Sequence, residues 1–163
     1  MKNRVVVLMA GLLACLMILG GCGPKYEPKN FSIGEMSIEL TTGFKKEYSD
    51  KYDAMYISQK IGVYVTKDAF EDYEEDVDIE NMSLYGYAEG LINGNELDAK
   101  VQMDKGLTTF THEVRVDKTY YTYYVVVYKA ETAFWRVEFA TRSDSFEDQL
   151  DAIRDYAWSV EFE

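Results

Sequence analysis

Cysteine, histidine and proline are scarce in this chain of 163 residues. It contains two cysteines (Cys15 and Cys22), one histidine (His112) and two prolines. A Ser-His-Asp arrangement could use only His112, and no GxSxG, P-loop, GxGxxG or HExxH motif is present. We therefore predict no catalytic residue, no metal ligand and no cofactor, and we expect His112 to be a core or partly buried residue. The protein is not expected to be an enzyme.

Charged residues are absent from Val5–Leu19, which follows a short basic start at Lys2 and Arg4 and precedes a pair of glycines. A basic start, an apolar middle and small residues at the end are the three parts of an export signal. The apolar run is shorter than the roughly 20 residues that a membrane-spanning helix needs. Residues 1–21 are therefore predicted to be a signal peptide.

The order Leu19-Gly20-Gly21-Cys22 resembles the lipobox of bacterial lipoproteins. The resemblance implies that a diacylglyceryl group is attached to the Cys22 sulfur and that the chain is cut before this residue. Two acyl chains anchor stably, whereas one holds only marginally. Because Cys15 would leave with the signal, the mature chain would have no disulfide, no CxxC pair and no cysteine-rich metal site. We expect it to lie on the outer face of the bacterial cytoplasmic membrane, with the membrane and an envelope protein as partners.

Basic residues are outnumbered, with 17 lysines and arginines against 29 aspartates and glutamates. Two of the basic residues, Lys2 and Arg4, fall in the predicted signal peptide, so residues 22–163 carry a formal charge of 15 − 29 = −14. This balance argues against a nucleic-acid partner and against a domain that lies flat on anionic lipid. The 14 tyrosines, eight phenylalanines and two tryptophans supply a core, which excludes a disordered chain.

Both prolines lie in residues 22–30, which have no apolar periodicity. This segment is predicted to be a tether with an extended reach of roughly 25–30 Å. No repeat and no second linker follows it, and the mature chain has the length of one ordinary domain. We therefore assign residues 31–163 to a single domain.

Apolar and polar residues alternate in most of this domain, as in half-buried strands. Strands are predicted at residues 31–33, 36–40, 54–58, 61–66, 107–116, 120–128 and 133–141, and within the C-terminal WSVEFE. Helices are predicted at Leu84–Ile92, after an N-cap at Ser83, and at Phe146–Ala157, after Ser143-Asp144-Ser145. The pattern predicts an α+β domain with a single antiparallel sheet of about six or seven strands and two main helices packed on it.

The three consecutive strands between residues 107 and 141 can be paired residue by residue. A turn at Asp117-Lys118 sets the first hairpin, because a hairpin register is fixed by its turn. The pairs predicted on one face are Val114 with Tyr121, His112 with Tyr123, and Phe110 with Val125. The pairs predicted on the other face are Arg115 with Tyr120, Glu113 with Thr122, and Thr111 with Tyr124.

The next hairpin has two candidate registers. A two-residue turn at Ala130-Glu131 would place Trp135 on the polar face, and Ala-Glu lacks the positive-φ residues that a type I′ turn prefers. An odd loop is consistent face by face, so we predict that register. It pairs Trp135 with Val125, Val137 with Tyr123, and Phe139 with Tyr121.

In that register one face of the sheet is a helix-covered core and the other face is mixed. The mixed face carries Arg115, Tyr120, Tyr124, Arg136 and Glu138. Tyrosine and arginine are the residue types that most often carry binding energy at interfaces. A partner-binding face is therefore predicted around Tyr120, Tyr124 and Arg136. The alternative is an ordinary solvated sheet face, which antiparallel sheets commonly have.

The acidic run at residues 71–80 places Asp76, Asp78 and Glu80 at the first, third and fifth positions of an EF-hand loop. Such a loop also needs a glycine at position 6 and a bidentate glutamate at position 12, and neither is present. We predict a solvated acidic loop that leads into a helix, which acidic residues near a helix N-terminus would stabilise. A looser calcium site at Glu71 to Glu80 stays open.

The segments FSIGEMSIELTTGF (31–44) and AFWRVEFAT (133–141), followed by a helical segment and AWSVEF (157–162), resemble small bacterial lipoproteins of the PsbP-like fold. That fold, shared with an extrinsic photosystem II subunit and a Ran-binding import factor, is an antiparallel sheet flanked by helices. The resemblance spans nearly all of residues 31–162 and implies a non-enzymatic binding or assembly role. It supplies no catalytic or ligand-binding residues.

Two alternative functions stay open. A small-ligand or cation sensor would need a concave pocket with convergent polar groups. An envelope hydrolase would need a cleft with carboxylates of displaced pKa.

Overall fold

The structure is a computed structural model and describes residues 26–74 and 78–163. The predicted signal peptide, Cys22 and the first part of the predicted tether lie outside the described residues.

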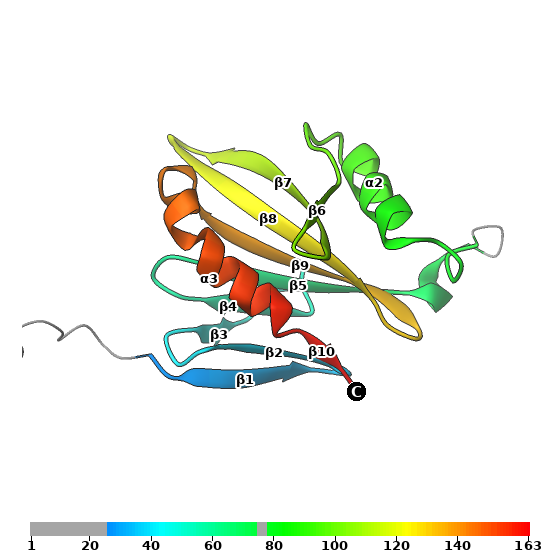
Figure 1. Ribbon diagram of the computed structural model, residues 1–163, viewed down its shortest axis with the longest axis horizontal. Coiled ribbons are helices and arrows are strands. Elements are labelled where there is room, and N and C mark those ends of the chain that lie inside the picture. The colour runs from blue at the N-terminus through cyan, green and yellow to red at the C-terminus, as the bar shows by residue number, and fades with distance from the viewer. Residues whose placement is uncertain (1–25, 75–77) are drawn as a thin grey trace, which may run out of the picture.

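Seven strands form one antiparallel sheet in the spatial order β3-β4-β5-β9-β8-β7-β6. Their bounds are β3 Lys45–Glu47, β4 Ala54–Ile57, β5 Gly62–Ala69, β6 Gln102–Asp104, β7 Leu107–Val116, β8 Thr119–Lys129 and β9 Ala133–Arg142. A smaller antiparallel sheet has the order β1-β2-β10, with β1 Pro28–Ile33, β2 Met36–Thr41 and β10 Glu161–Phe162. The helices are α2 Leu84–Gly94 and α3 Phe146–Trp158, and two 3₁₀ turns are η1 Phe70–Asp72 and η2 Ser143–Ser145 (Figure 1).

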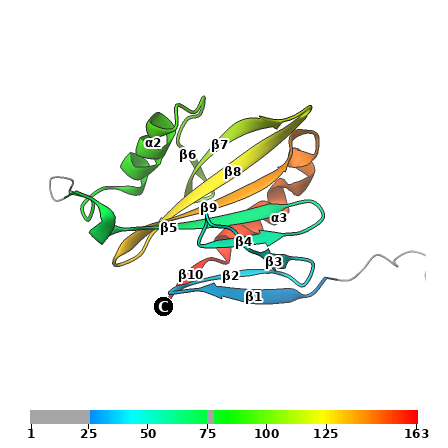
Figure 2. The ribbon, with the colours of Figure 1, turned by 180° about the vertical axis from the view of Figure 1, so that it is seen from behind.

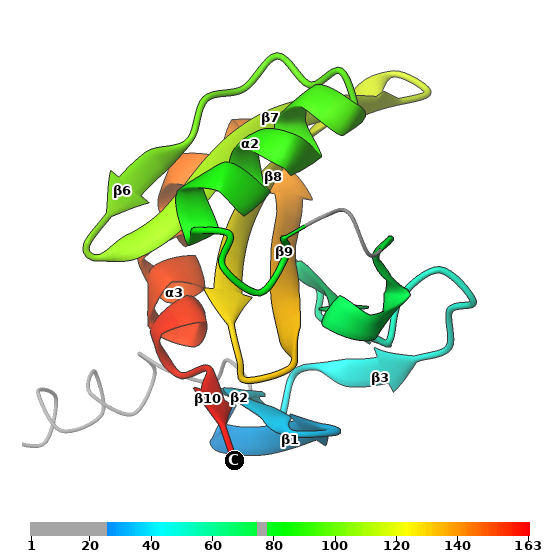
Figure 3. The same ribbon diagram turned by 90° about the vertical axis from the view of Figure 1, so that its right-hand side faces the viewer.

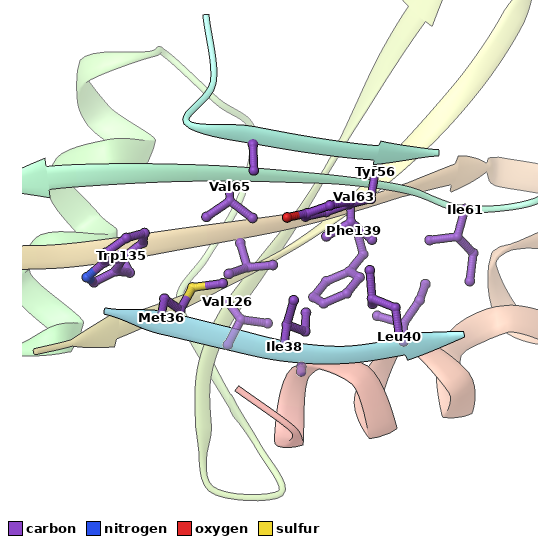
Figure 4. Close-up of a cluster of buried hydrophobic side chains, with 14 of the residues drawn as sticks. Met36, Ile38, Leu40, Tyr56, Ile61, Val63, Val65, Val126, Trp135 and Phe139 are labelled. Atoms are coloured by element: carbon purple, nitrogen blue, oxygen red, sulfur yellow. The ribbon is translucent and has the colours of Figure 1, made fainter. Parts of the chain in front are cut away.

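The α+β class and the two main helices are confirmed, but the prediction of a single sheet is wrong. β2 pairs with β1 and β10 instead of extending the edge of the large sheet. Its inward side chains Met36, Ile38 and Leu40 are at most 1% exposed and belong to the main core (Figure 4). Packing this hairpin on the face of the large sheet buries apolar surface, which is the dominant favourable term in folding.

Helix α3 and the small sheet cover the same face of the large sheet, which we call the α3 face (Figure 1). Apolar residues recur every three or four positions along α3, as predicted, and so form one buried stripe. Ile153 from this stripe packs in the core with Val63 of β5, Val126 of β8 and Phe139 of β9, and all four are fully buried.

Helix α2 packs on the opposite face, the α2 face, but lies over only one side of the sheet (Figures 2 and 3). Ser83 is its N-cap, as predicted, because the Ser83 hydroxyl accepts a hydrogen bond of 3.0 Å from the Gly86 N–H. The ring of Tyr87 stacks on Phe134 of β9, with centroids 4.2 Å apart. The Tyr87 hydroxyl also donates a hydrogen bond to Asp68 of β5.

Strand β1 begins at Pro28, three residues before the predicted start of the domain. The segment assigned to a tether therefore includes ordered backbone, and Glu27 accepts a 2.8 Å hydrogen bond from the Thr42 N–H. β1 is an edge strand, and proline is tolerated as the first residue of such a strand because its missing N–H leaves no ladder bond unmade. Proline alone was thus a misleading sign of irregular structure here.

The register predicted for the β7–β8 hairpin is confirmed at all six pairs, whereas the register predicted for β8–β9 is wrong. Trp135 pairs with Tyr128, Val137 with Val126, and Phe139 with Tyr124. The turn residues are Glu131 and Thr132, and the Ala130 N–H donates to the Ala133 oxygen at 2.9 Å. Because β8 is apolar on both faces, its hydrophobic pattern does not distinguish between registers that turn Trp135 to opposite sides.

Two short strands were not predicted, because β3 (KKE) and β6 (QMD) have almost no apolar residues. Lys105 and Gly106 connect β6 to β7 with φ values of 49° and 90°. Two residues with positive φ are typical of a tight hairpin turn, so the Lys-Gly pair was a usable signal.

A polar network joins this hairpin to β8 and α3. The Oδ2 atom of Asp104 accepts hydrogen bonds from the Tyr124 hydroxyl (2.9 Å) and from Arg154 Nε (2.8 Å). Burial by itself raises the pKa of Asp104, but the hydrogen bonds from Arg154 and Tyr124 outweigh burial and leave this pKa below its usual value. Burial, together with Asp104, raises the pKa of Tyr124 to about 12.

Asp104→Asn is expected to lower the free energy of unfolding by about 1–3 kcal/mol at neutral pH, since one partner of two hydrogen bonds loses its charge. Because the folded-state pKa is lowered, this stabilisation is present above the unfolded pKa of about 4 and is lost as pH falls through the folded pKa. Urea unfolding at pH 7 and at pH 3 measures both effects. Asp151→Asn is the matched control, because Asp151 contacts the same arginine but its side chain is 90% exposed. Equal losses in the two variants would contradict this account.

Candidate functional site

A half-open pocket of about 550 Å³ lies at one end of the large sheet, where the β4–β5 turn, the end of β9 and the start of α3 come together. This volume is within the range of about 300–1,000 Å³ that is usual for small-molecule sites. The three elements are also close together on one side of Figure 1. The pocket is built from a floor of small residues, walls of tyrosines and a polar rim.

The floor is formed where two neighbouring strands, β5 and β9, each place a small residue in a directly paired position. Gly62 of β5 pairs with Ala140 of β9, and Ala140 pairs in turn with Tyr123 of β8. A Cβ atom on Gly62 would lie 2.9 Å from the hydroxyl oxygen of Tyr64, so a larger residue would displace that ring. Glycine inside a strand often marks such a close approach.

Three half-buried tyrosines form the walls. Tyr121 and Tyr123 lie two residues apart on β8 and so point to the same face, and Tyr64 lies beyond the floor on β5. The rings of Tyr64 and Tyr123 are roughly parallel, with centroids 6.1 Å apart. Tyr52 continues the row, 4.9 Å from Tyr64. Burial, with smaller contributions from Tyr64 and Tyr52, raises the pKa of Tyr123 to about 12.

The rim is polar and comes from three elements. Its side chains are Gln59 and Lys60 of the β4–β5 turn, Arg142 at the end of β9, and Ser145, Asp148 and Gln149 at the start of α3. The β4–β5 turn is held by Ser58, whose hydroxyl donates to the Ile61 oxygen and accepts from the Ile61 N–H, each at 3.0 Å. Arg142 forms a 2.6 Å ion pair with Asp144. The rim therefore offers hydrogen-bond donors and acceptors, and both positive and negative side chains, beside the tyrosine walls.

Beside the pocket, the α2 face carries a charged pair. Arg136 Nε lies 3.0 Å from the Glu138 carboxylate, although this N–H makes no aligned hydrogen bond to any described residue. We regard the contact as an ion pair, because both side chains are largely buried at 22% and 13% exposure. Burial raises the pKa of Glu138, and Arg136 partly opposes that change. Glu138 does not line the pocket.

His112 is partly buried, as predicted, and its ring stacks on Tyr123 with centroids 5.1 Å apart. Its Nδ1 atom is buried and has no hydrogen-bond partner among the described residues. Burial first, and then the nearby charge of Arg136, lower the pKa of His112. Tyr123 therefore connects His112 with the pocket, because its ring stacks on His112 and also lines the pocket.

We expect the imidazole of His112 to titrate below pH 6.5 in the folded protein. The unfolded chain keeps a pKa near 6.5, so the stability due to neutral His112 is complete above about pH 6.5 and is lost as pH falls toward the folded pKa. Since this is the only histidine in the sequence, its imidazole NMR signals can be followed without ambiguity. His112→Phe, which keeps a ring but does not titrate, should reduce the pH dependence of unfolding just below pH 6.5. A folded-state pKa at or above 6.5 would disprove this expectation.

The predicted partner-binding face around Tyr120, Tyr124 and Arg136 is wrong, because these residues do not share a surface. Tyr124 is 3% exposed on the α3 face, where its hydroxyl contacts Asp104. Arg136 points to the α2 face, because it pairs with Val127 of β8. Tyr120 is 50% exposed, with Arg115 over its ring. The error follows directly from the wrong β8–β9 register, which had placed Arg136 with Tyr124.

The acidic run lies partly outside the described residues, since Asp76 is in the undescribed segment 75–77. Asp78 accepts hydrogen bonds from Asn81 Nδ2. Over residues 26–74 and 78–163, no three His, Cys, Asp or Glu side chains gather as a metal-binding group.

Within residues 26–74 and 78–163, no helix combines the length and apolar character needed to cross a membrane.

Sequence reasoning did not find the pocket. Its residues come from β5, β8, β9 and α3, which lie far apart along the chain, so no local pattern joins them. Gly62 lies inside the predicted strand at residues 61–66, and an isolated glycine in a strand can mark a close approach, but the sequence analysis did not use this signal.

No protein-family model matches the sequence. No curated protein matches it either. The fold, however, is similar to solved structures. The solution structure of cyanobacterial PsbP (CyanoP) from Synechocystis sp. PCC 6803 superposes with a TM-score of 0.54 at 10% sequence identity, over 90% of this chain and 99% of that one.

A crystal structure from Bacteroides thetaiotaomicron VPI-5482 superposes with a TM-score of 0.54 at 11% identity. That similarity covers 83% of this chain and 48% of the Bacteroides chain. At such low identity the similarity concerns the fold alone. The domain therefore has a PsbP-like fold, as the sequence resemblance implied.

Proposed function

We propose that this protein is a lipid-anchored, extracytoplasmic binding module, and that the pocket beside the β4–β5 turn is its ligand site. The single observation that carries the proposal is the pocket itself, a concavity in which three tyrosines and several polar side chains converge. Such a combination is the usual form of a small-molecule site. The lipobox-like sequence before Cys22 supports the anchor.

The position of the first described residue fits this proposal. Tyr26 lines a smaller cavity of about 220 Å³ with Gln59 and Gln149, and these two residues also belong to the pocket rim. Tyr26 comes four positions after Cys22, which corresponds to at most roughly 13–14 Å of extended chain. An anchor at Cys22 would therefore hold the pocket near the membrane surface.

The pocket supports binding more than catalysis. Among the described residues, Glu138 is the carboxyl group whose pKa is raised overall, because burial outweighs the opposing charge of Arg136, and it lies outside the pocket lining. An acid–base mechanism needs such a group within reach of the reacting atoms. We therefore favour a role in which the ligand is held and presented without chemical change.

A photoreactive amino acid placed at Gln149 tests the proposal in intact cells. Gln149 is on the pocket rim, whereas Asp155 is an exposed residue of the same helix outside the pocket, so Asp155 is the matched control position. Irradiation is expected to give a covalent adduct of defined mass only from the Gln149 position. Filling the floor with Ala140→Leu should abolish that adduct. The same yield from both positions would contradict a ligand site in the pocket.

A further inference from the structure

We propose that the ligand of the pocket is a saccharide, with the apolar face of a sugar ring against Tyr121 and its hydroxyl groups toward the rim. The inference rests on the proposed function, since it names the ligand class of the same site. It follows from the shape of the walls, the chemistry of the rim and the poor fit of other ligand classes.

The walls offer the ring of Tyr121 together with the polar groups of the other two tyrosines. Tyr123 stacks on His112 at 5.1 Å and lies 6.1 Å from Tyr64, which in turn contacts Tyr52, so Tyr123 and Tyr64 present mainly ring edges and hydroxyls to the pocket. Tyr121 also lines the pocket, is half-buried, and is the wall tyrosine whose ring face a ligand would contact. A pyranose ring presents C–H groups on its flat faces and hydroxyls around its edge. Tyrosine matches both features, because it joins an apolar ring to a polar hydroxyl.

The rim supplies donors and acceptors together. Gln149 offers an amide oxygen and two N–H groups, Asp148 only acceptors, and Arg142 only donors. Each sugar hydroxyl both donates and accepts, so a rim of mixed character can pair with several hydroxyls at once. A site that hydrogen-bonds hydroxyl groups also rejects analogues that lack them, because its own polar groups would then be left unpaired.

Other ligand classes fit this pocket less well. An anion such as phosphate would meet the carboxylate of Asp148, and Asp144 partly neutralises the charge of Arg142 at 2.6 Å while leaving other guanidinium N–H groups to donate. A cation would meet Lys60 and Arg142. An acyl chain would cover the rim groups without pairing them, which costs free energy for every polar group that loses water.

Isothermal titration of the protein purified from membranes, in a detergent without a sugar headgroup, tests the inference. The probes are chitotetraose, cellotetraose and maltotetraose, and saturable binding of at least one of them is expected. Tyr121→Ala should weaken that binding by about tenfold or more, since an aromatic contact is removed. Tyr120→Ala is the matched control, because Tyr120 is the neighbouring residue of the same strand and so points to the opposite face. It should leave the affinity unchanged.

If Tyr121→Ala fails to fold, Ala140→Leu tests the inference instead. Its larger side chain fills the floor of the pocket, and none of the three tyrosines is replaced. Absence of saturable binding to all three saccharides would overturn the inference, as would equal weakening by Tyr120→Ala and Tyr121→Ala. The proposed function is judged separately. An adduct from Gln149 together with no saccharide binding would leave a ligand site of another class. No adduct and no saccharide binding would reject both proposals.

Discussion

Replacing Cys22 with serine is expected to abolish lipid attachment completely and to leave an uncleaved or non-lipidated precursor. The reason is chemical: in the lipobox that Leu19-Gly20-Gly21-Cys22 resembles, the acyl groups are carried on the cysteine sulfur, and a serine hydroxyl does not replace it. Metabolic labelling with a fatty-acid analogue, followed by separation of membrane and soluble fractions, measures both the label and the location. Without two acyl chains, stable membrane anchoring is lost.

The matched control for this experiment is Cys15→Ser. Cys15 lies within the predicted signal peptide, so its replacement is expected to change neither the label nor the membrane fraction. Equal labelling of the Cys22→Ser variant and the wild-type protein would rule out the anchor and, with it, the proposed position of the pocket near the membrane surface.

Replacing Tyr87 with alanine is expected to have the largest effect on stability, a loss of about 3–5 kcal/mol in the free energy of unfolding. Tyr87 is 4% exposed, its ring is nearly parallel to Phe134 of β9 at an interplanar angle of 7°, and its hydroxyl donates to Asp68. The substitution removes the main aromatic contact between α2 and the sheet and leaves a cavity. Urea unfolding at neutral pH, followed by circular dichroism, measures the loss.

Tyr85→Ala provides the comparison within the same helix, because Tyr85 is 53% exposed and its loss should cost no more than about 0.5 kcal/mol. Tyr87→Phe separates the two contributions of Tyr87. It keeps the stacked ring and removes only the hydrogen bond, so a loss of about 1 kcal/mol is expected. Similar losses in Tyr85→Ala and Tyr87→Ala would show that α2 does not depend on this stacking for its position.

Local patterns predicted those parts of the fold that depend on neighbouring residues. The Asp117-Lys118 turn set the β7–β8 register correctly, and Ser83 was recognised as an N-cap from its position before an apolar helical pattern. In both cases the interacting groups are close in sequence, and the geometry of one turn or one helix end determines the contact.

The β8–β9 register was not predicted correctly from local patterns. Val125, Val126 and Val127 are all at most 1% exposed, although they alternate between the two faces of the sheet. Since both faces are covered, neither choice of register leaves an apolar residue in water. Packing of Trp135 and Phe139 in the core with β2 and α3 therefore selects the register. These contacts join segments that are far apart in the sequence, so a local pattern does not contain them. The error also moved Arg136 to the wrong face and produced a partner-binding face that does not exist.

The sequence by itself determined the α+β class, the two main helices and most strand positions, because each depends on the spacing of apolar residues within one segment. Only the tertiary structure decided that β1, β2 and β10 form a separate sheet, and that Gly62 and Ala140 meet beneath Tyr64, Tyr121 and Tyr123. The physical reason is that a pocket is defined by the space left between side chains from distant segments. That space depends on strand register and packing, which no single segment specifies.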